Sequence, residues 1–501
     1  MMAFYSVSAL TRPIMGSRRS LFCLSRLKTS NALIAINTIR NNSSSTASAA
    51  SPLSTSYAKD AVGLPTLGGP TKNNNEQNTP SIWPLQRLTT AALLRTIFLS
   101  RLFTSPKLSS FGLKLLQGIT NSHQPFLDPD RNWLLNRILR AVIYNNFCSG
   151  AEPLEIRRTL ASIKNVGYAG VILTYAREIV VNHLGEDNLD SDQVAAQQIQ
   201  QWLDGNMQTL SMIDPGDYLA IKYTGAGGRV ASALTTGEKP PKQFQEAMDK
   251  LCQQAQAQGS RIIVDAEQQA YQSTIDEWTV DVMRKYNRGK EALVLNTYQS
   301  YLKASRKIIR DHLARAQKEG WTLGIKVVRG AYISNDIRER IHDTKAETDA
   351  SYNGIAHDLL VRSFDGITRK DFPKIQLFLA GHNADSIHKA AQLHRDLTLQ
   401  GLNPGALEFG QLHGMADHVS GELLAYIDSL RESKGPFGKQ GALGHEAIPR
   451  AYKCATWGTV RECLGFLTRR AVENQGAAER LQDGLAEAKR ELKARIFRTP
   501  R

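Results

Sequence analysis

The chain has 501 residues, a mass of 55.5 kDa and an apolar fraction of 42%, which is ample for a sizeable core. This length suits one large domain with additions, or two to three ordinary domains. No run of 18 apolar residues occurs, so the composition excludes a helix that spans a bilayer.

The formal charge of +15 is concentrated at the N-terminus. Residues 1–59 contain seven Lys or Arg and no Asp or Glu, and they are rich in Ser, Thr, Asn and Ala. This composition is typical of a mitochondrial transit peptide. A plain disordered basic tail is the alternative. Removing these seven charges from +15 leaves +8, which weakens the case for a nucleic-acid partner.

The cysteines indicate a reducing compartment. Cys23, Cys148, Cys252, Cys454 and Cys463 form no CxxC pair. The sequence therefore predicts neither a disulfide framework nor a zinc site.

Residues 60–83 are a linker rich in Gly, Pro and Asn. Residues 84–129 are predicted to be a helical segment. Its first part, 84–103, is apolar but punctuated by Arg87, Arg95 and Arg101. This part fits an anionic membrane surface. We favour the alternative that it packs on the domain as an amphipathic helix.

From residue 130 to about 480, short β-branched runs alternate with helical patterns, which favours a parallel sheet with crossover helices. Eight such units fit a closed (βα)8 barrel, with residues 481–501 as a basic helical tail. Two segments, near 183–210 and 431–449, are interpreted as insertions. The expected strands are 170–174, 218–223, 261–265, 292–296, 323–328, 375–380, 407–411 and 452–455. The expected helices are 153–165, 242–258, 267–285, 298–319, 336–362 and 385–399.

Residues 459–476 are predicted to form one more helix. Thr459 and Glu462 make a capping box, and Gly476 can supply a left-handed end. Arg469 and Arg470 then project about 100° apart and can bracket one small anion. Each planar guanidinium can donate paired charge-assisted hydrogen bonds, so the two together are well suited to bind a carboxylate. A solvated basic helix end is the alternative.

Polar residues stand at nearly every expected strand end, and a barrel gathers these ends at one mouth. Any single one of them is equally well explained as a partner for loop backbone. The set is Lys222, Asp265, Glu267, Asn296, Lys326, Arg329, His382, Asn383, Gln411 and His413.

The segments LGIKVVRGAY, LAGHNADS, LEFGQLHGMAD and FLTRRAVEN, in this order, resemble the mitochondrial branch of the proline dehydrogenase family. The resemblance covers residues 130–480. It implies a distorted (βα)8 TIM-like barrel that binds FAD and oxidises L-proline to Δ1-pyrroline-5-carboxylate. Hydride passes to flavin N5 and electrons then pass to ubiquinone. The implied location is the matrix side of the mitochondrial inner membrane, with peripheral membrane association and no nucleic acid.

The resemblance also implies roles for particular residues. Arg469 and Arg470 would hold the proline carboxylate with Lys222, and Asp265 would support these three cations. Tyr332 and Leu412 would shape the pocket around the proline ring, and Lys326 would lie beside flavin N5. The other residues implied to contact FAD are Asn296, Val328, Gly330, Ala331, His382, Asn383 and Glu473.

Two positions depart from the family pattern. Cys454 and Phe466 stand where many members have Tyr. A smaller Cys454 would admit a substituted ring such as hydroxyproline, so hydroxyproline oxidation is an alternative function. Cys454 is equally well explained as a buried thiol that fills space.

Three other classes were considered. Gly225-Ala-Gly-Gly228 follows a strand as in a Rossmann dehydrogenase, but its spacing is incomplete. A metal-dependent barrel hydrolase would use His382, His413 and His418 with the Asp265/Glu267 pair. A basic membrane or RNA adaptor is the non-enzyme alternative.

Overall fold

The computed structural model describes residues 84–122, 124–176, 191–432, 448–473 and 477–497. In these ranges the side chains of residues 103, 104, 106, 469–473 and 477–483 are left undescribed. The expected transit peptide, the linker and most of the expected insertion at 431–449 lie outside the described residues. Among the described helices, none has the length and apolar character needed to cross a membrane.

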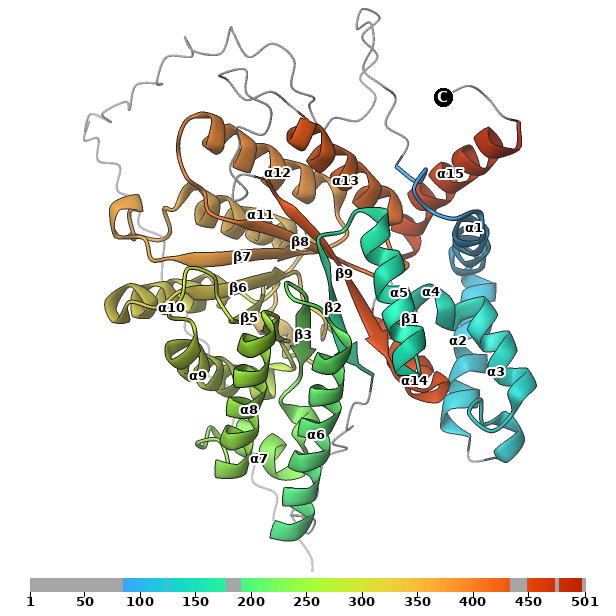
Figure 1. Ribbon diagram of the computed structural model, residues 1–501, viewed down its shortest axis with the longest axis horizontal. Helices are drawn as coiled ribbons and strands as arrows, with labels where there is room; N and C mark the ends of the chain where they lie inside the picture. Colours follow the sequence, from blue (N-terminus) through green and yellow to red (C-terminus); the bar gives the residue numbers. More distant parts are fainter. Residues whose placement is uncertain (1–83, 123, 177–190, 433–447, 474–476, 498–501) are drawn as a thin grey trace, which may run out of the picture. The chain divides into compact units, whose positions relative to one another are not determined.

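Eight parallel strands close into a barrel at the centre of Figure 1. Each strand pairs with the next along the chain, and the last pairs with the first and completes the ring. The predicted TIM-like α/β fold is therefore confirmed. The strands are β2 (Gly170–Tyr175), β3 (Tyr218–Ile221), β4 (Arg261–Val264), β5 (Val294–Gln299), β6 (Leu323–Val328), β7 (Ile375–Ala380), β8 (Leu407–Leu412) and β9 (Arg450–Trp457).

The barrel is irregular where it closes. β9 pairs with β8 from Arg450 to Cys454, and beyond this point the short strand β1 (Cys148–Gly150) takes the place of β8. β1 follows the N-terminal helices, so this exchange fastens the N-terminal part of the chain to the wall of the barrel.

Crossover helices surround the strands (Figure 1). Several of them end at a residue with left-handed backbone, such as Gly259 (φ 73°) after α8. The helices are α5 (Pro153–Val166), α6 (Asp192–Met212), α7 (Gly228–Thr236), α8 (Lys242–Gln258), α9 (Gln269–Tyr286), α10 (Ser305–Glu319), α11 (Lys345–Val361), α12 (Ala384–Leu399) and α13 (Asp417–Glu432).

Three predictions of helices need correction. The helix in 183–210 is α6, and it is the crossover between β2 and β3 rather than an insertion. Residues 298 and 299 continue strand β5, so α10 begins only at Ser305. Residues 336–344 form a loop with a short 3-10 turn, η4 (Arg338–Arg340), before α11 begins at Lys345.

The remaining helices lie beside the barrel (Figure 1). The N-terminal helices share a buried apolar cluster with α14, which includes Leu116, Ile143 and Leu464, and α1 also packs against α15. These elements are α1 (Thr90–Thr104), α2 (Pro106–Asn121), η1 (Pro125–Leu127), α3 (Trp133–Leu139), η2 (Arg140–Tyr144), α4 (Asn145–Phe147), α14 (Val460–Glu473) and α15 (Ala477–Ile496).

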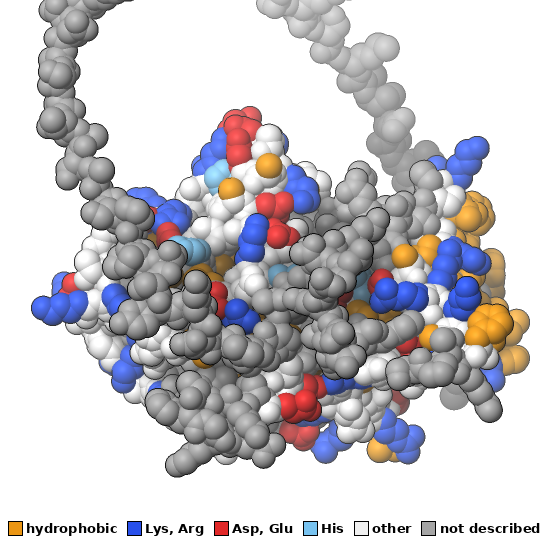
Figure 2. Space-filling model, turned by 90° about the horizontal axis from the view of Figure 1, so that it is seen from above, with side chains coloured by type: hydrophobic (Ala, Val, Ile, Leu, Met, Phe, Trp, Pro, Cys, Tyr) orange, Lys and Arg blue, Asp and Glu red, His pale blue; other side chains and the backbone are white. Residues whose placement is uncertain are grey.

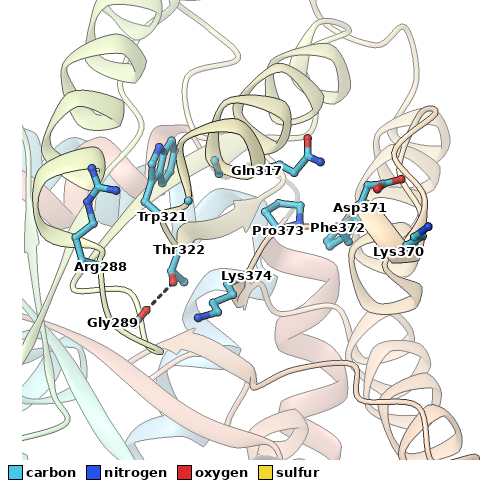
Figure 3. Close-up of a pocket in the computed structure, with 12 residues that line it drawn as sticks. Arg288, Gly289, Gln317, Trp321, Thr322, Lys370, Asp371, Phe372, Pro373 and Lys374 are labelled. Carbon is cyan, nitrogen blue, oxygen red and sulfur yellow. Dashed lines mark hydrogen bonds between the residues drawn. The ribbon is translucent and has the colours of Figure 1, made fainter.

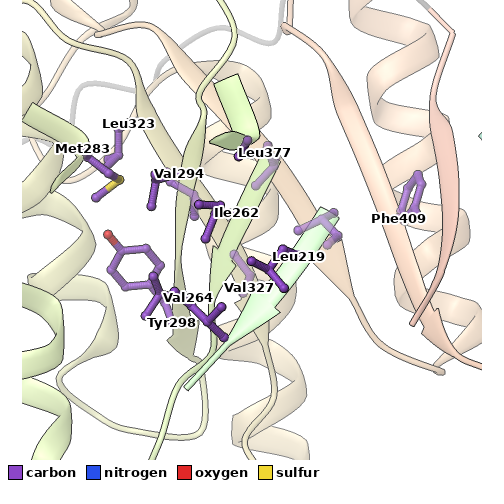
Figure 4. Close-up of a cluster of buried hydrophobic side chains, with 14 of the residues drawn as sticks. Leu219, Ile262, Val264, Met283, Val294, Tyr298, Leu323, Val327, Leu377 and Phe409 are labelled. Atoms are coloured by element: carbon purple, nitrogen blue, oxygen red, sulfur yellow. The ribbon is translucent and has the colours of Figure 1, made fainter. Parts of the chain in front are cut away.

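The main core lies between the strands and the crossover helices. Figure 4 shows Ile262, Val264 and Val294 from the strands with Met283 from α9 in this layer. A second, smaller cluster fills the barrel itself and includes Tyr218, Ile263, Leu295, Phe378 and Tyr452. Since side chains alternate along a strand, these two clusters show which residues point outward and which point inward.

The amino ends of the strands close the barrel around one carboxylate. Glu408 is 0% exposed, and it accepts hydrogen bonds from Tyr452 Oη (3.0 Å), Gln376 Nε2 (2.9 Å) and Tyr218 Oη. Arg261 Nη2 (3.0 Å) and Arg450 Nη2 (3.1 Å) supply the opposite charge. Burial alone raises the pKa of Glu408, but Arg261 and then Arg450 outweigh it and hold this pKa below its usual range. These partners hydrogen-bond and neutralise the buried carboxylate of Glu408, which apolar side chains could not do.

Candidate active site

The opposite end of the barrel, at the carboxyl ends of the strands, is here called the barrel mouth. Lys326, Leu412 and Cys454 lie on the inward-facing positions of β6, β8 and β9. Lys222 and Asp265 continue the inward-facing positions one residue beyond β3 and β4. The structure therefore brings these five predicted residues to one place.

The charges at the mouth are paired. Lys326 Nζ donates to Asp265 Oδ1 at 2.7 Å, and both side chains are largely buried. Lys222 Nζ lies 5.6 Å from the centre of the Phe466 ring, a cation–π distance. The support of Lys222 by Asp265 stays a prediction. Phe466 belongs to α14, so this contact fixes that helix over the mouth.

Cys454 lies among these charges as a neutral thiol. Burial raises the pKa of Cys454 to about 12, and Lys326, Asp265 and Lys222 are its electrostatic neighbours. A thiol with such a pKa remains protonated at neutral pH, so it cannot act as a thiolate nucleophile. It contributes shape to the mouth rather than charge.

Four more predicted residues follow Lys326 closely. Val328 is the last residue of β6, and Gly330, Ala331 and Tyr332 lie in the loop after it, where Tyr332 is buried. Gly330 has φ 150°, and a Cβ at this position would lie 2.5 Å from the ring of Tyr301. Glycine is therefore required here.

Gln299 fixes this loop from the end of β5. Its Oε1 accepts from Ala331 N at 3.1 Å, and its Nε2 donates to Glu267 O at 3.0 Å. The sequence analysis assigned Gln299 no role in the site.

His382 and Asn383 stand at the end of β7. Leu412 N donates to His382 Nε2 at 3.0 Å, so this ring nitrogen is an acceptor. The Asn383 side chain caps α12 by accepting from Ser386 N at 3.0 Å. These contacts order the turn after β7 and connect it to the turn after β8.

Asn296 is not brought to the mouth. It lies on the outward-facing side of β5 with Val294 and Tyr298, and it is 0% exposed. Its Nδ2 donates to Asp276 Oδ1 on α9 at 2.8 Å. Its side chain therefore belongs to the layer between strands and helices. Burial raises the pKa of this Asp276 to about 7.

Helix α14 begins at the capping box that the sequence predicts. Thr459 N donates to Glu462 Oε2 at 2.9 Å, and Glu462 N donates to Thr459 Oγ1 at 3.3 Å. The backbone of Arg469, Arg470 and Glu473 lies in this helix. Their side chains lie outside the described residues, as does Gly476.

Two further cations hold the mouth in shape, and sequence reasoning assigned them no role. Arg329 Nε donates to Asp349 Oδ1 (2.6 Å) and its Nη2 to Ser386 Oγ (2.8 Å), so it joins β6 to α11 and α12. Lys453 Nζ donates to Asp417 Oδ1 (2.8 Å) and Met415 O (3.0 Å), which ties down the loop after β8. A lysine inside an apolar run is the signal that could have identified Lys453.

The fold does not support one of the rival interpretations. The closed barrel differs from the open sheet of a Rossmann dehydrogenase, and residues 225–228 lead into α7. Among the residues that the structure describes, no three His, Cys, Asp or Glu side chains come together as a metal-binding group.

A hollow of about 380 Å³ lies at the other end of the barrel. Trp321 and Thr322, which precede β6, line it with Lys374, which precedes β7 (Figure 3). Thr322 Oγ1 donates to Gly289 O at 2.8 Å across its edge. None of the predicted site residues lines this hollow.

Comparison with known proteins identifies a family for this chain. Residues 156–483 match the family model described as proline dehydrogenase. The probable mitochondrial proline dehydrogenase of Schizosaccharomyces pombe is 29% identical over 425 residues, which cover 73% of this chain and 82% of that protein. A hydroxyproline dehydrogenase of Bos taurus is 26% identical over 81% of this chain and 90% of its own length.

Other relatives align over a shorter stretch. The mitochondrial proline dehydrogenases of Drosophila, human, Caenorhabditis and cattle match over 33% to 39% of their own length. A crystal structure of proline utilization A from Bdellovibrio bacteriovorus shares the fold, with a TM-score of 0.56 and 16% identity. The match covers 76% of this chain and 38% of that one. The family match spans well over half of the chain, so this protein belongs to the proline dehydrogenase family of oxidoreductases.

Proposed function

We propose that this protein oxidises L-proline to Δ1-pyrroline-5-carboxylate with bound FAD and passes the electrons to ubiquinone. One observation carries the proposal. At the barrel mouth two inward-facing cations, Lys222 and Lys326, lie with the carboxylate of Asp265 and the uncharged side chains of Leu412 and Cys454. Such a site suits a small zwitterion held against a cofactor that gains negative charge.

The substrate carboxylate is assigned to Arg469 and Arg470, with help from Lys222. Charge-assisted hydrogen bonds of about 1.5–3 kcal/mol each are enough to fix one orientation of a small ring. Phe466 lies beneath the Lys222 ammonium and is therefore placed to contact that ring. Tyr332, Leu412 and Cys454 complete the proposed wall.

The residues at the mouth fit FAD. Lys326 is a buried cation that faces the barrel interior, and a cation stabilises the reduced form of a flavin. Val328, Gly330, Ala331, His382, Asn383 and Glu473 are the other proposed contacts. FAD, when bound, accepts the hydride that leaves C5 of proline. The proline ring nitrogen first gives one proton to water, and its lone pair then forms the C5–N double bond as the hydride leaves.

The visible spectrum of the purified chain tests substrate and cofactor together. A flavin spectrum that bleaches on addition of L-proline without oxygen is expected. Colourless protein from a well-folded preparation would refute the proposal. Arg469→Met and Arg470→Met are expected to raise the proline concentration that half-reduces the flavin by about tenfold or more, while FAD stays bound. An unchanged proline requirement would refute the clamp.

Hydroxyproline is the second candidate substrate, and Cys454 is the observation that favours it. This small side chain lies on the inner wall next to Lys326 and Asp265. The similarity to a hydroxyproline dehydrogenase points the same way. Cys454→Tyr is expected to lower turnover of hydroxyproline relative to proline; an equal ratio in variant and wild type would rule out this role.

The proposed location is the matrix side of the mitochondrial inner membrane, with peripheral membrane association. The acid-free residues 1–59 and the relatives named mitochondrial support it. Separated mitochondrial fractions test the location, and recovery in the intermembrane space would exclude it.

A further inference from the structure

The N-terminal helices expose an unusual number of large apolar side chains. Trp133 is 75% exposed, Phe111 68% and Phe126 64%. Single exposed hydrophobic residues need no explanation, but a concentration of them marks an interaction surface. The members are Leu94 and Phe98 of α1, Leu108, Phe111 and Leu115 of α2, Phe126 of η1, and Trp133, Leu134 and Ile138 of α3. They are called here the α1–α3 face.

Helix α2 shows that this exposure is not a by-product of folding. Leu116 and Ile119 bury one side of α2 in the cluster shared with α14. Leu108, Phe111 and Leu115 precede Ile119 at helical spacing, so they extend the same apolar stripe, but they remain exposed. The apolar stripe of α2 is therefore only partly covered, although such a stripe normally faces a core.

The charge around the face is predominantly positive. Residues 84–147 contain eight Lys or Arg and two Asp. Lys107 and Lys114 flank Phe111 at helical spacing, and both are exposed. Arg131 and Arg137 stand beside Trp133 and are exposed as well. In Figure 2 hydrophobic and basic side chains gather at the right-hand end, where Figure 1 places α1–α3.

We propose that the α1–α3 face lies on an anionic lipid bilayer, with Phe111, Phe126 and Trp133 inserted between the headgroups. This inference deepens the proposed membrane association by assigning its surface. Aromatic side chains surrounded by Lys and Arg are what an interfacial anchor requires, because the rings enter the lipid while the cations meet anionic headgroups.

The positive charge of the α1–α3 face argues against two other binding partners for this surface. Residues 1–59 carry seven Lys or Arg and no acid, so this segment would be repelled by a face of the same sign. A second copy of the face would be repelled in the same way. Only an anionic partner gains from both the apolar and the charged side chains.

The face is fixed to the helix over the barrel mouth. Arg461 of α14 donates to Thr120 O (3.3 Å) and Ser122 O (2.7 Å) at the end of α2. The same helix α14 carries Phe466, which contacts Lys222. A bilayer under the α1–α3 face would therefore lie on the side of the molecule where α14 covers the site.

Co-sedimentation of the full-length flavin-loaded enzyme with lipid vesicles tests the proposal. Binding to vesicles that contain phosphatidylglycerol is expected to exceed binding to pure phosphatidylcholine vesicles. The double variant Phe111→Glu with Trp133→Glu is expected to bind the anionic vesicles at least about tenfold more weakly. Leu399→Glu, an exposed leucine at the end of α12, is the matched control and is expected to bind like wild type.

Each outcome decides the question. Equal binding of the double variant and the control would overturn the proposal, since all variants retain residues 1–59. A wild-type dimer that the double variant converts to monomer, with vesicle binding unchanged, would assign the face to a second copy instead. Flavin reduction by L-proline, measured on the same samples, tests the proposed function separately and is expected to be equal in all three proteins.

Discussion

Asp265 pairs with Lys326, the lysine that we propose to lie beside the flavin. The 2.7 Å ion pair cancels much of the field of the buried ammonium. Lys222 contacts the ring of Phe466. We propose different roles for the two lysines at the mouth: Lys326 towards the cofactor and Lys222 towards the substrate carboxylate.

Asp265→Asn is expected to make the flavin midpoint potential more positive by about 30 mV or more, because the unpaired Lys326 charge then stabilises the reduced flavin. Redox titration of the purified flavoprotein measures this shift. Asp249→Asn removes a carboxylate that pairs with Lys285 on the surface of α8, so it should leave the potential unchanged. A potential that stays constant or falls in Asp265→Asn would show that Lys326 does not act on the flavin.

At the scale of elements, α14 is the helix on which the proposed site depends. It carries the two arginines, its Phe466 contacts Lys222, and its first turn is closed by the Thr459–Glu462 capping box. The chain contains a second capping box of the same kind, Thr344 with Glu347, at the start of α11. Only the Thr459 box belongs to α14. Variants of the two boxes therefore separate an effect on the stability of the protein from an effect on the geometry of the proposed site.

Thr459→Ala and Thr344→Ala are each expected to lower the free energy of unfolding by about 1 kcal/mol, since each removes one cap. Thermal unfolding measures this loss. Thr459→Ala alone is expected to raise the proline concentration for half-maximal flavin reduction, by about two- to tenfold, because α14 positions the clamp. If both variants raised this proline concentration equally, the effect would come from general destabilisation rather than from α14.

For the whole molecule, the barrel keeps its charged groups at its two ends and in the helix layer. Glu408 closes the amino end with two arginines, and the mouth carries the proposed site. Between strands and helices lies His312, which is buried and hydrogen-bonded through Nδ1 to Tyr298 Oη at 2.7 Å. Burial lowers the pKa of His312 to about 4.

This histidine makes the global stability depend on pH. The unfolded chain protonates His312 near pH 6.5, whereas the folded protein protonates it only near pH 4. Its stabilising contribution is therefore complete above pH 6.5 and is lost as the pH falls towards 4. His312→Asn keeps a polar partner for Tyr298 but does not titrate. Urea unfolding between pH 8 and 4 should show the stability difference between wild type and variant shrinking with falling pH. A constant difference would contradict the lowered pKa.

Local patterns in the sequence are enough to predict most of the barrel. Residues 242–258, 323–328 and 375–380 form the predicted helix and strands with the predicted bounds. The capping box at Thr459 is equally local, since it needs only two side chains three residues apart. Alternation of strands and helices was sufficient to predict eight parallel units, because a crossover connection requires it.

The sequence by itself determined the family, the order of the elements and which strand ends carry polar groups. Tertiary structure alone decided where those groups point. Strands of a parallel barrel are covered on both faces, so an apolar run does not show which residues face inward. Asn296 and Lys326 look alike in sequence, yet one points to α9 and the other to the mouth. The pairing of Asp265 with Lys326 was also decided by the tertiary structure, because Asp265 follows β4, Lys326 lies on β6, and the strand β5 stands between them in the barrel.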